Sequence, residues 1–251
     1  MRKLLAIWLG KILTIVGKTV GKKSSSSPGA YALKICPDLV KGLEKCVSKG
    51  IIVTCGTNGK TTTNNLMASA LEAKGYKVIC NKLGANMLSG IATTVLQEMS
   101  IFGKLKADYA CLEIDEAYTP IVFDYVKPDV MVITNLFRDQ LDRYGEIDIT
   151  SDIIKRAIKK VPNLKLVLNG DDPLCVQFGR EENVKAYYYG ISEKVLPQLD
   201  DRKDVSVLYA VRNRSTITII TVSSAIFIAR RAVSSDLRLI LKSRMYRSTH
   251  R

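Results

Sequence analysis

A glycine turn followed by a lysine and two threonines is the part of the sequence best suited to chemistry. It consists of Gly56, Thr57, Asn58, Gly59, Lys60, Thr61 and Thr62. Glycines let backbone N–H groups close around phosphate oxygens, and the first turn of a helix adds positive partial charge. Lys60 can reach the β- and γ-phosphates of a nucleotide, and the Thr61 hydroxyl can coordinate Mg²⁺. We therefore predict a site for ATP with Mg²⁺, in which Lys60 takes part in catalysis.

The segments on both sides of this turn support the prediction. Residues 51–55 form an apolar run of strand length, and residues 61–74 follow as a helix that Gly75 ends. One position departs from the general phosphate-loop pattern, since Thr54 stands where that pattern has a glycine.

The rest of the core alternates between strand-like and helical segments. Strands are predicted over residues 77–81, 109–114, 130–134 and 165–169, and helices over 37–49, 91–99 and 148–160. This alternation predicts an α/β fold, a doubly wound and mostly parallel sheet with helices on both faces. Ligands of such sheets bind at the carboxyl ends of the strands.

Acidic residues follow one of these strands. Glu113 lies at the end of the run 109–114, where its carboxylate can meet a metal ion held by Thr61. The alternative is a solvated acid at a strand end. Asp115 and Glu116 are candidates for binding metal or water, or they are acids at the start of a helix.

The charge is distributed unevenly along the chain. The formal net charge is +14, of which residues 1–23 carry +6 and residues 205–251 carry +8, so the core between them is neutral. A neutral core with two basic ends does not form a basic groove, which argues against a nucleic-acid partner. The six cysteines include no CxxC pair and are interpreted as reduced core thiols.

Residues 1–23 are predicted to form a basic amphipathic helix. At 100° per residue its lysines share one arc, and the opposite arc holds Leu5, Trp8, Leu9, Ile12, Ile15 and Val16. Lys11 interrupts the apolar stretch that a signal peptide would need. Two interpretations remain open, a helix on an anionic membrane surface and a helix docked on the protein. Residues 24–50 are predicted to be a linker and a short helix.

Several further motifs occur in a fixed order along the chain. They are GTNGKTTT, GANMLSGIATT, LEIDEA, TNLFRDQLDRYGEID and LNGDDPL, and they cover about residues 30–200. In this order they resemble the Mur ligase family, to which the folylpolyglutamate synthases are similar. The resemblance implies that residues 51–204 are an ATP-binding central domain.

The resemblance also implies roles for individual residues. Asn86 matches an asparagine near the phosphates, and Glu113 matches a Mg²⁺-binding glutamate. Gln140 stands where many Mur ligases have a metal-binding histidine, which puts a second Mg²⁺ in doubt. Asn135, Arg138 and Asp139 match the lip around nucleotide or substrate, or they form a helix cap and salt bridges. The segment 169–173 resembles a family turn, for which an Asx turn is the alternative.

The motif variants with Gln140 are similar to the amidating branch of the family. That branch implies an ATP-dependent amide ligase that activates the D-glutamate α-carboxylate of lipid II for amidation in peptidoglycan biosynthesis. It further implies a glutaminase partner, GatD, and a cytoplasmic protein at the inner face of a bacterial membrane. Two alternatives remain: a ligase that adds an amino acid, and an inactive ATP-binding remnant.

Residues 205–251 form an atypical tail without glycine or proline. The family has a zinc ribbon inserted near this point and then a C-terminal domain. Read one base early, the tail can encode two CxxC pairs separated by 18 codons, a spacing within the zinc-ribbon range. We therefore expect a frameshift after about residue 204, with no zinc ligands in the chain as translated. A strand over residues 215–222 is the alternative structure for part of this tail.

Overall fold

The computed structural model describes residues 1–19, 26–82, 84–136, 146–180, 184–190, 208–213 and 216–221. Its main sheet consists of β1 (Val47–Cys55), β2 (Val78–Cys80), β3 (Ala107–Glu113), β4 (Val130–Ile133), β5 (Lys165–Asn169) and β6 (Lys185–Tyr189). The strand order is β2-β3-β1-β4-β5-β6, and all neighbours pair in parallel. The predicted parallel sheet is therefore confirmed.

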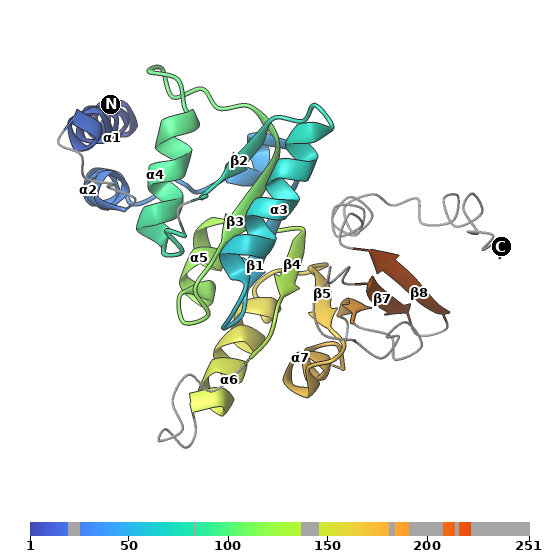
Figure 1. The fold of residues 1–251 in the computed structure, drawn as a ribbon. Coiled ribbons are helices and arrows are strands. Elements are labelled where there is room, and N and C mark those ends of the chain that lie inside the picture. Colours follow the sequence, from blue (N-terminus) through green and yellow to red (C-terminus); the bar gives the residue numbers. More distant parts are fainter. Residues whose placement is uncertain are drawn as a thin grey trace.

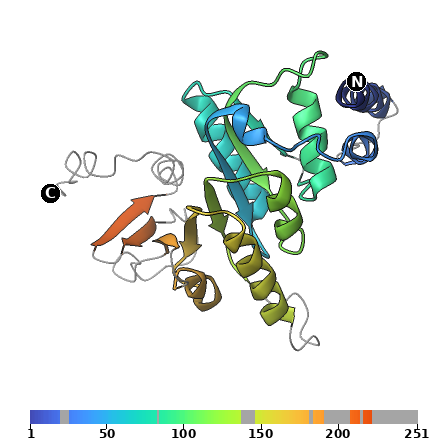
Figure 2. The same cartoon turned by 180° about the vertical axis from the view of Figure 1, so that it is seen from behind.

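Helices cover both faces of this sheet. They are α1 (Arg2–Thr19), α2 (Ser27–Ile35), α3 (Lys60–Ala73), α4 (Leu88–Glu98), α5 (Thr119–Tyr125), α6 (Glu146–Lys159) and α7 (Pro173–Phe178). Figure 1 shows α3 in front of the sheet, and the reverse view in Figure 2 shows α4, α5 and α6 on the other face. Two helical layers enclose the sheet as the doubly wound pattern requires.

The central strand β1 shows why the sheet is enclosed on both sides. Ile51, Val53 and Cys55 point into the larger core, which α4 to α7 cover, whereas Ile52 points into the smaller core under α3. All four side chains are completely buried. A strand buried on both faces reads as a nearly continuous apolar run, and residues 51–55 are apolar except for the buried Thr54.

The predicted helix over residues 37–49 is wrong. Residues 37–42 form turns, a short 3₁₀ helix covers Leu43–Lys45, and β1 already begins at Val47. Gly42 has a φ of 79°, which breaks the helical path, and Val47 pairs with Ala107 of β3. Sheet pairing therefore overrides the local helical pattern.

Three short helices escaped the sequence prediction, although each carries a signal at its start. Pro28, Pro120 and Pro173 occupy the first or second position of α2, α5 and α7. Proline suits the first turn because its missing N–H has no intrahelical partner there. The parallel strand β6 was missed as well.

The predicted N-terminal helix is present and docks on the protein. α1 contacts α2 and α4. Ala6, Ile7 and Gly10 are buried at this contact. The apolar arc predicted for this helix instead faces outward. None of the described helices is long and apolar enough to cross a membrane.

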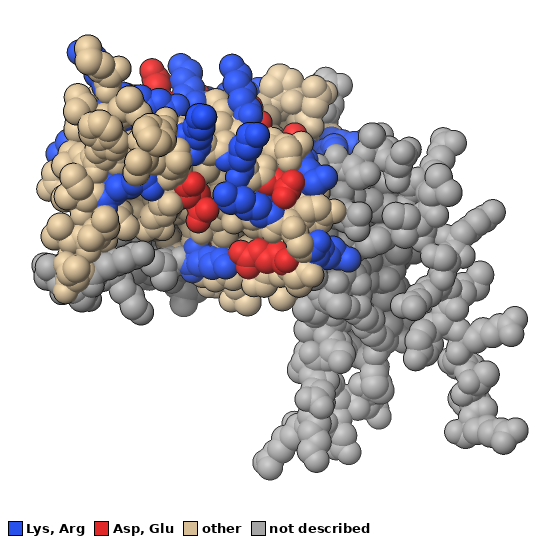
Figure 3. All heavy atoms as spheres, turned by 90° about the horizontal axis from the view of Figure 1, so that it is seen from above, with Lys and Arg blue, Asp and Glu red and all other residues tan. Residues whose placement is uncertain are grey.

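Beyond β6 the structure describes one antiparallel pair, β7 (Leu208–Asn213) with β8 (Thr216–Thr221). β8 agrees with the alternative of a strand over residues 215–222. The remainder of the tail, most of the linker after α1 and the predicted frameshift lie outside the described residues. Seen from above, basic side chains stand among acidic ones on this face of the molecule (Figure 3). This mixture differs from the basic groove of a nucleic-acid-binding protein.

Candidate nucleotide-binding site

The glycine turn lies where three neighbouring strands end. Residues 56–59 connect β1 to α3, while Glu113 ends β3, and Thr134 and Asn135 follow β4. β1 lies between β3 and β4, so these groups gather at one edge of the sheet. The carboxyl edge of a parallel sheet is where ligands of such folds bind.

Asn135 fixes the shape of the turn. Its Oδ1 atom accepts a hydrogen bond from the Asn58 backbone N–H at 2.9 Å, and its Nδ2 atom donates to the Asn58 carbonyl oxygen at 3.0 Å. The Asn135 carbonyl oxygen accepts from the Thr57 N–H at 2.8 Å. Asn135, predicted as a lip residue, thus braces the phosphate loop.

The close approach of β4 explains one glycine of the turn. Gly56 has a φ of 124°, and a Cβ atom there would lie 2.3 Å from Thr134 Oγ1 and 2.8 Å from the Asn135 carbonyl oxygen. Thr134 Oγ1 also donates to the Asn58 carbonyl oxygen at 2.7 Å. Only glycine fits this contact without displacement of the brace.

The start of α3 supplies donors that face outward. Thr63 donates its N–H to the Gly59 carbonyl oxygen, so the N–H groups of Lys60, Thr61 and Thr62 precede the first intrahelical bond. These groups and the positive end of the helix form a place for an anion. The phosphate site at Gly59, Lys60, Thr61 and Thr62 stays a prediction, and exposed N–H groups at the helix start are what it requires.

The Lys60 ammonium group lies inside the loop. Its Nζ atom donates to the carbonyl oxygens of Gly56 and Thr57 and to Glu116 Oε1, the last at 3.0 Å. Glu116 Oε1 also accepts from the Gly56 N–H at 2.8 Å. A carboxylate oxygen therefore occupies donors that a phosphate oxygen would use.

Glu113 has the surroundings of a metal ligand. Its side chain is 2% exposed, and Oε2 is buried without a hydrogen-bond partner. Gly84 lies beside both Glu113 and Thr61. A Cβ atom on Gly84 would lie 3.7 Å from Glu113 Oε2 and 3.5 Å from Thr61 Oγ1, so the two oxygens are near the same point. The alternative of a solvated strand-end acid is wrong, because β3 carries the carboxylate into a buried position beside α3.

These residues fit a Mg²⁺ ion. A buried carboxylate oxygen without a partner is costly unless it meets a proton donor or a cation. Mg²⁺ takes oxygen ligands and commonly uses one or two protein groups together with phosphate oxygens. Glu113 and Thr61 are the two protein groups that would hold it.

Asn81 positions Glu113 and was not among the residues predicted for the site. It is 3% exposed. Its Oδ1 atom accepts from the Glu113 N–H and its Nδ2 atom donates to the Glu113 carbonyl oxygen, both at 2.8 Å. A polar side chain at the carboxyl end of the predicted strand 77–81 was the signal available for it.

The remaining predicted residues have different positions. The Asn86 carbonyl oxygen accepts from the Asp115 N–H at 3.0 Å, which places Asn86 beside the end of β3. Asp115 Oδ1 accepts from the Ala117 N–H at 3.0 Å just before α5, so Asp115 follows the helix-start alternative. Arg138, Asp139 and Gln140 lie outside the described residues.

The turn over residues 169–173 takes the Asx form. The Asp171 N–H donates to Asn169 Oδ1 at 3.0 Å. Asp172 caps α7 by accepting from the Leu174 N–H, and its Oδ2 accepts from the Leu136 N–H at 2.8 Å. Asp172 therefore fastens the segment after β4 to α7.

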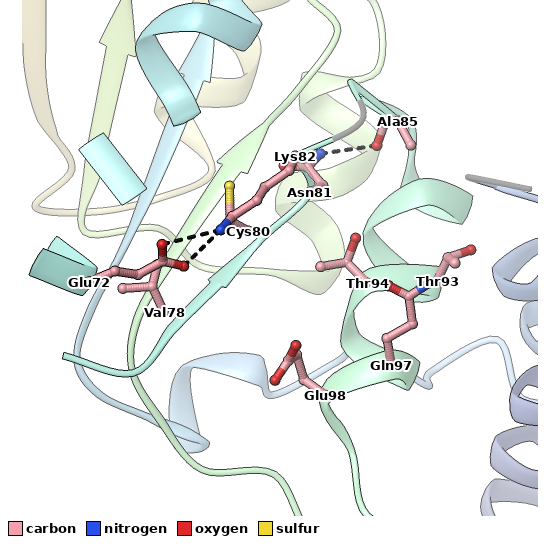
Figure 4. Close-up of a pocket in the computed structure, with 10 residues that line it drawn as sticks. All are labelled: Glu72, Val78, Cys80, Asn81, Lys82, Ala85, Thr93, Thr94, Gln97 and Glu98. Atoms are coloured by element: carbon pink, nitrogen blue, oxygen red, sulfur yellow. Dashed lines mark hydrogen bonds and ion pairs between the residues drawn. The ribbon is translucent and has the colours of Figure 1, made fainter. Parts of the chain in front are cut away.

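A separate cavity of 280 Å³ opens beside the edge strand β2 (Figure 4). Its lining is mainly polar, and two of the lining residues, Lys82 and Glu72, form an ion pair on one side of it with a distance of 2.9 Å. None of residues 56–62 lines this cavity. The described residues contain no group of three His, Cys, Asp or Glu side chains that could hold a metal ion.

Fold and site together define a protein class. The family model described as the Mur ligase middle domain matches residues 53–233, and the chain belongs to this family. The solved structures agree: MurF of Acinetobacter baumannii covers 81% of this chain and 47% of its own, with a TM-score of 0.58 at 16% identity. MurF of Thermotoga maritima in complex with ADP covers 80% of this chain and 48% of its own, with a TM-score of 0.56 at 17% identity.

Two curated relatives point to one branch of the family. Both are named lipid II isoglutaminyl synthase (glutamine-hydrolyzing) subunit MurT. The protein of Staphylococcus aureus is 39% identical over 75% of this chain, and that of Streptococcus pneumoniae is 45% identical over 61%. The matches span 42% and 33% of the two relatives, so this chain corresponds to less than half of each.

Proposed function

We propose that this chain is the ATP-binding part of an amide ligase that acts on lipid II. ATP binds with its phosphates against the loop 56–62 and the start of α3. The α-carboxylate of D-glutamate in the stem peptide attacks the γ-phosphorus, ADP leaves, and an acyl phosphate forms. Ammonia then attacks the acyl carbon and phosphate leaves, which gives the D-isoglutamine amide.

The placement of Lys60, Thr61 and Glu113 at one sheet edge is the observation that carries the proposal. The Lys60 ammonium group and the N–H groups of the helix start offset negative charge on the transferring phosphoryl group. A Mg²⁺ ion at Thr61 and Glu113 would neutralise further phosphate charge. Asn135 keeps the loop in shape, so that little reorganisation accompanies the transfer.

The choice of substrate rests on the relatives. The two MurT proteins are named for lipid II and for glutamine hydrolysis, which supports lipid II as the acceptor and ammonia from a glutaminase as the nitrogen source. We propose that a GatD-type glutaminase subunit is the partner and that the protein works in the bacterial cytoplasm. The zinc ribbon of the family is expected beyond residue 204, and we propose no zinc ligands in this chain.

Binding and turnover test the proposal separately. Calorimetry with Mg²⁺ and a non-hydrolysable ATP analogue tests the site, and Lys60→Ala is expected to weaken binding by about tenfold to a hundredfold. Lys82→Ala removes an exposed ion pair at the other end of α3 and serves as the matched control. Unchanged binding in Lys60→Ala would remove Lys60 from the site.

Turnover is measured as ammonia-dependent ATP hydrolysis with lipid II, with and without the glutaminase. Amide formation on lipid II supports the proposed reaction. Hydrolysis that depends on an amino acid in place of ammonia would indicate an amino-acid-adding ligase. Tight ATP binding without any turnover would identify a nucleotide-binding remnant.

A further inference from the structure

α1 has two opposite faces with different roles. Ala6, Ile7 and Gly10 face the protein and are buried, and a Cβ atom on Gly10 would lie 2.6 Å from Leu96 Cδ1 of α4. Small residues at this contact let the two helices approach closely. The helix is therefore fixed on the domain through one side only.

The opposite face presents large apolar side chains to solvent. Leu5, Trp8, Ile12, Ile15 and Val16 are 49–63% exposed. At 100° per residue they share an arc centred opposite Ala6 and Gly10. A contiguous apolar strip of this kind on a soluble domain marks an interaction surface.

A neighbouring loop extends this strip. Trp8 Nε1 donates to the Ile101 carbonyl oxygen at 2.9 Å, and Gly103 packs against Ile7. The next side chain, Phe102, is 73% exposed. Two segments far apart in the sequence thus place apolar groups on the same side of the molecule.

Basic side chains flank the strip. The sequence has no acidic residue before Asp38. At 100° per residue the exposed Arg2 and the half-exposed Lys11 lie about 90° to either side of the strip on α1, and Lys104 and Lys106 are exposed beside Phe102. An apolar strip with a cationic rim complements an anionic lipid surface, where apolar groups enter the acyl boundary and basic groups meet the headgroups.

We propose that α1 and the loop 101–104 form a lipid-docking surface that lies on an anionic bilayer without crossing it. The half-exposed Trp8 sits at the level where indole rings favour the membrane interface. Docking requires neither nucleotide nor lipid II, so it stands independently of the proposed ligase reaction. It would hold the domain at the surface where a lipid-linked substrate resides.

The chain contains a built-in probe, because Trp8 is its only tryptophan. The full chain is mixed with vesicles of phosphatidylglycerol and phosphatidylcholine, and with vesicles of phosphatidylcholine alone. We expect a blue shift of Trp8 emission and sedimentation with the anionic vesicles, both decreasing as salt is added. Absence of a shift and of sedimentation with anionic vesicles would overturn the proposal.

Two variants separate docking from a general loss of apolar surface. Ile15→Asp changes the strip, whereas Ile149→Asp changes an isoleucine of similar exposure, 61%, on α6. We expect Ile15→Asp to lower the apparent vesicle affinity about tenfold or more and Ile149→Asp to leave it unchanged. An equal loss of vesicle affinity in both variants would contradict the proposal. Sedimentation velocity that shows a dimer, in which a second copy covers the strip, would contradict it as well. Circular dichroism melting confirms that both variants stay folded.

Discussion

The Glu116 carboxylate and the Lys60 ammonium group form an ion pair inside the phosphate loop, with Oε1 and Nζ 3.0 Å apart. Both side chains are largely buried, at 14% and 15% exposure. Glu116 Oε1 also accepts from the Gly56 N–H. A phosphate that approaches the loop therefore competes with a carboxylate for the same donors.

Glu116→Gln should strengthen nucleotide binding. The amide keeps an acceptor oxygen but removes the negative charge, so a phosphate displaces a weaker partner. We expect calorimetry with a Mg²⁺–ATP analogue to show affinity higher by about threefold to tenfold. Glu72→Gln, which loses the exposed pair with Lys82, is the control and should change nothing. Weaker binding in Glu116→Gln would show that the carboxylate positions Lys60 for the nucleotide.

Glu113→Gln should uncouple nucleotide binding from Mg²⁺. The amide is a poorer ligand for a hard cation, so the gain in nucleotide affinity on adding Mg²⁺ should shrink about tenfold. Without Mg²⁺ the variant should melt at a higher temperature than the unsubstituted chain, because a neutral amide costs less to bury than a carboxylate. Asp115→Asn is the neighbouring control, and equal Mg²⁺ dependence in all three proteins would exclude Glu113 as a ligand.

Two glycines of the turn should differ in their tolerance of alanine. A Cβ on Gly56 meets Thr134 and Asn135, whereas one on Gly59 has nothing within 4 Å. Both have positive φ, 124° and 78°. We expect Gly56→Ala to lower the free energy of unfolding by about 2–4 kcal/mol and Gly59→Ala by about 1 kcal/mol. Denaturant unfolding measures both variants. An equal decrease in the free energy of unfolding would show that the close approach of β4 to Gly56 does not contribute to stability.

Cys80 should react slowly with alkylating reagents. Burial raises the pKa of its thiol to about 11, and the nearby Lys82 ammonium only partly opposes this. At about pH 8 roughly one molecule in a thousand then carries the reactive thiolate, compared with about a quarter for an ordinary thiol. Mass-spectrometric mapping should show labelling that accelerates about tenfold per pH unit up to pH 10. Labelling as fast as in the denatured chain at pH 8 would contradict the burial of this group.

The local parts of the fold were readable from the sequence. Residues 51–55 and 165–169 were predicted as strands because short, mostly apolar segments suit strands buried on both faces, and β1 and β5 contain them. The helix over residues 61–74 became α3 with a shift of one residue at each end. The segment 37–49 was misread because pairing with β3, a contact with residues far along the chain, decided its structure.

The sequence by itself determined the strand, glycine turn and helix start around Lys60 and Thr61, since these residues are adjacent and short-range geometry decides their conformation. Only the tertiary structure decided that Asn135 braces this loop, that Glu116 enters it and that Glu113 is buried beside Thr61. These partners lie about fifty or more residues apart, and no local propensity encodes which of several polar side chains at a sheet edge will meet. Packing of the helices against the sheet decides which of these side chains meet, because it fixes the distances between the strand ends and the start of α3.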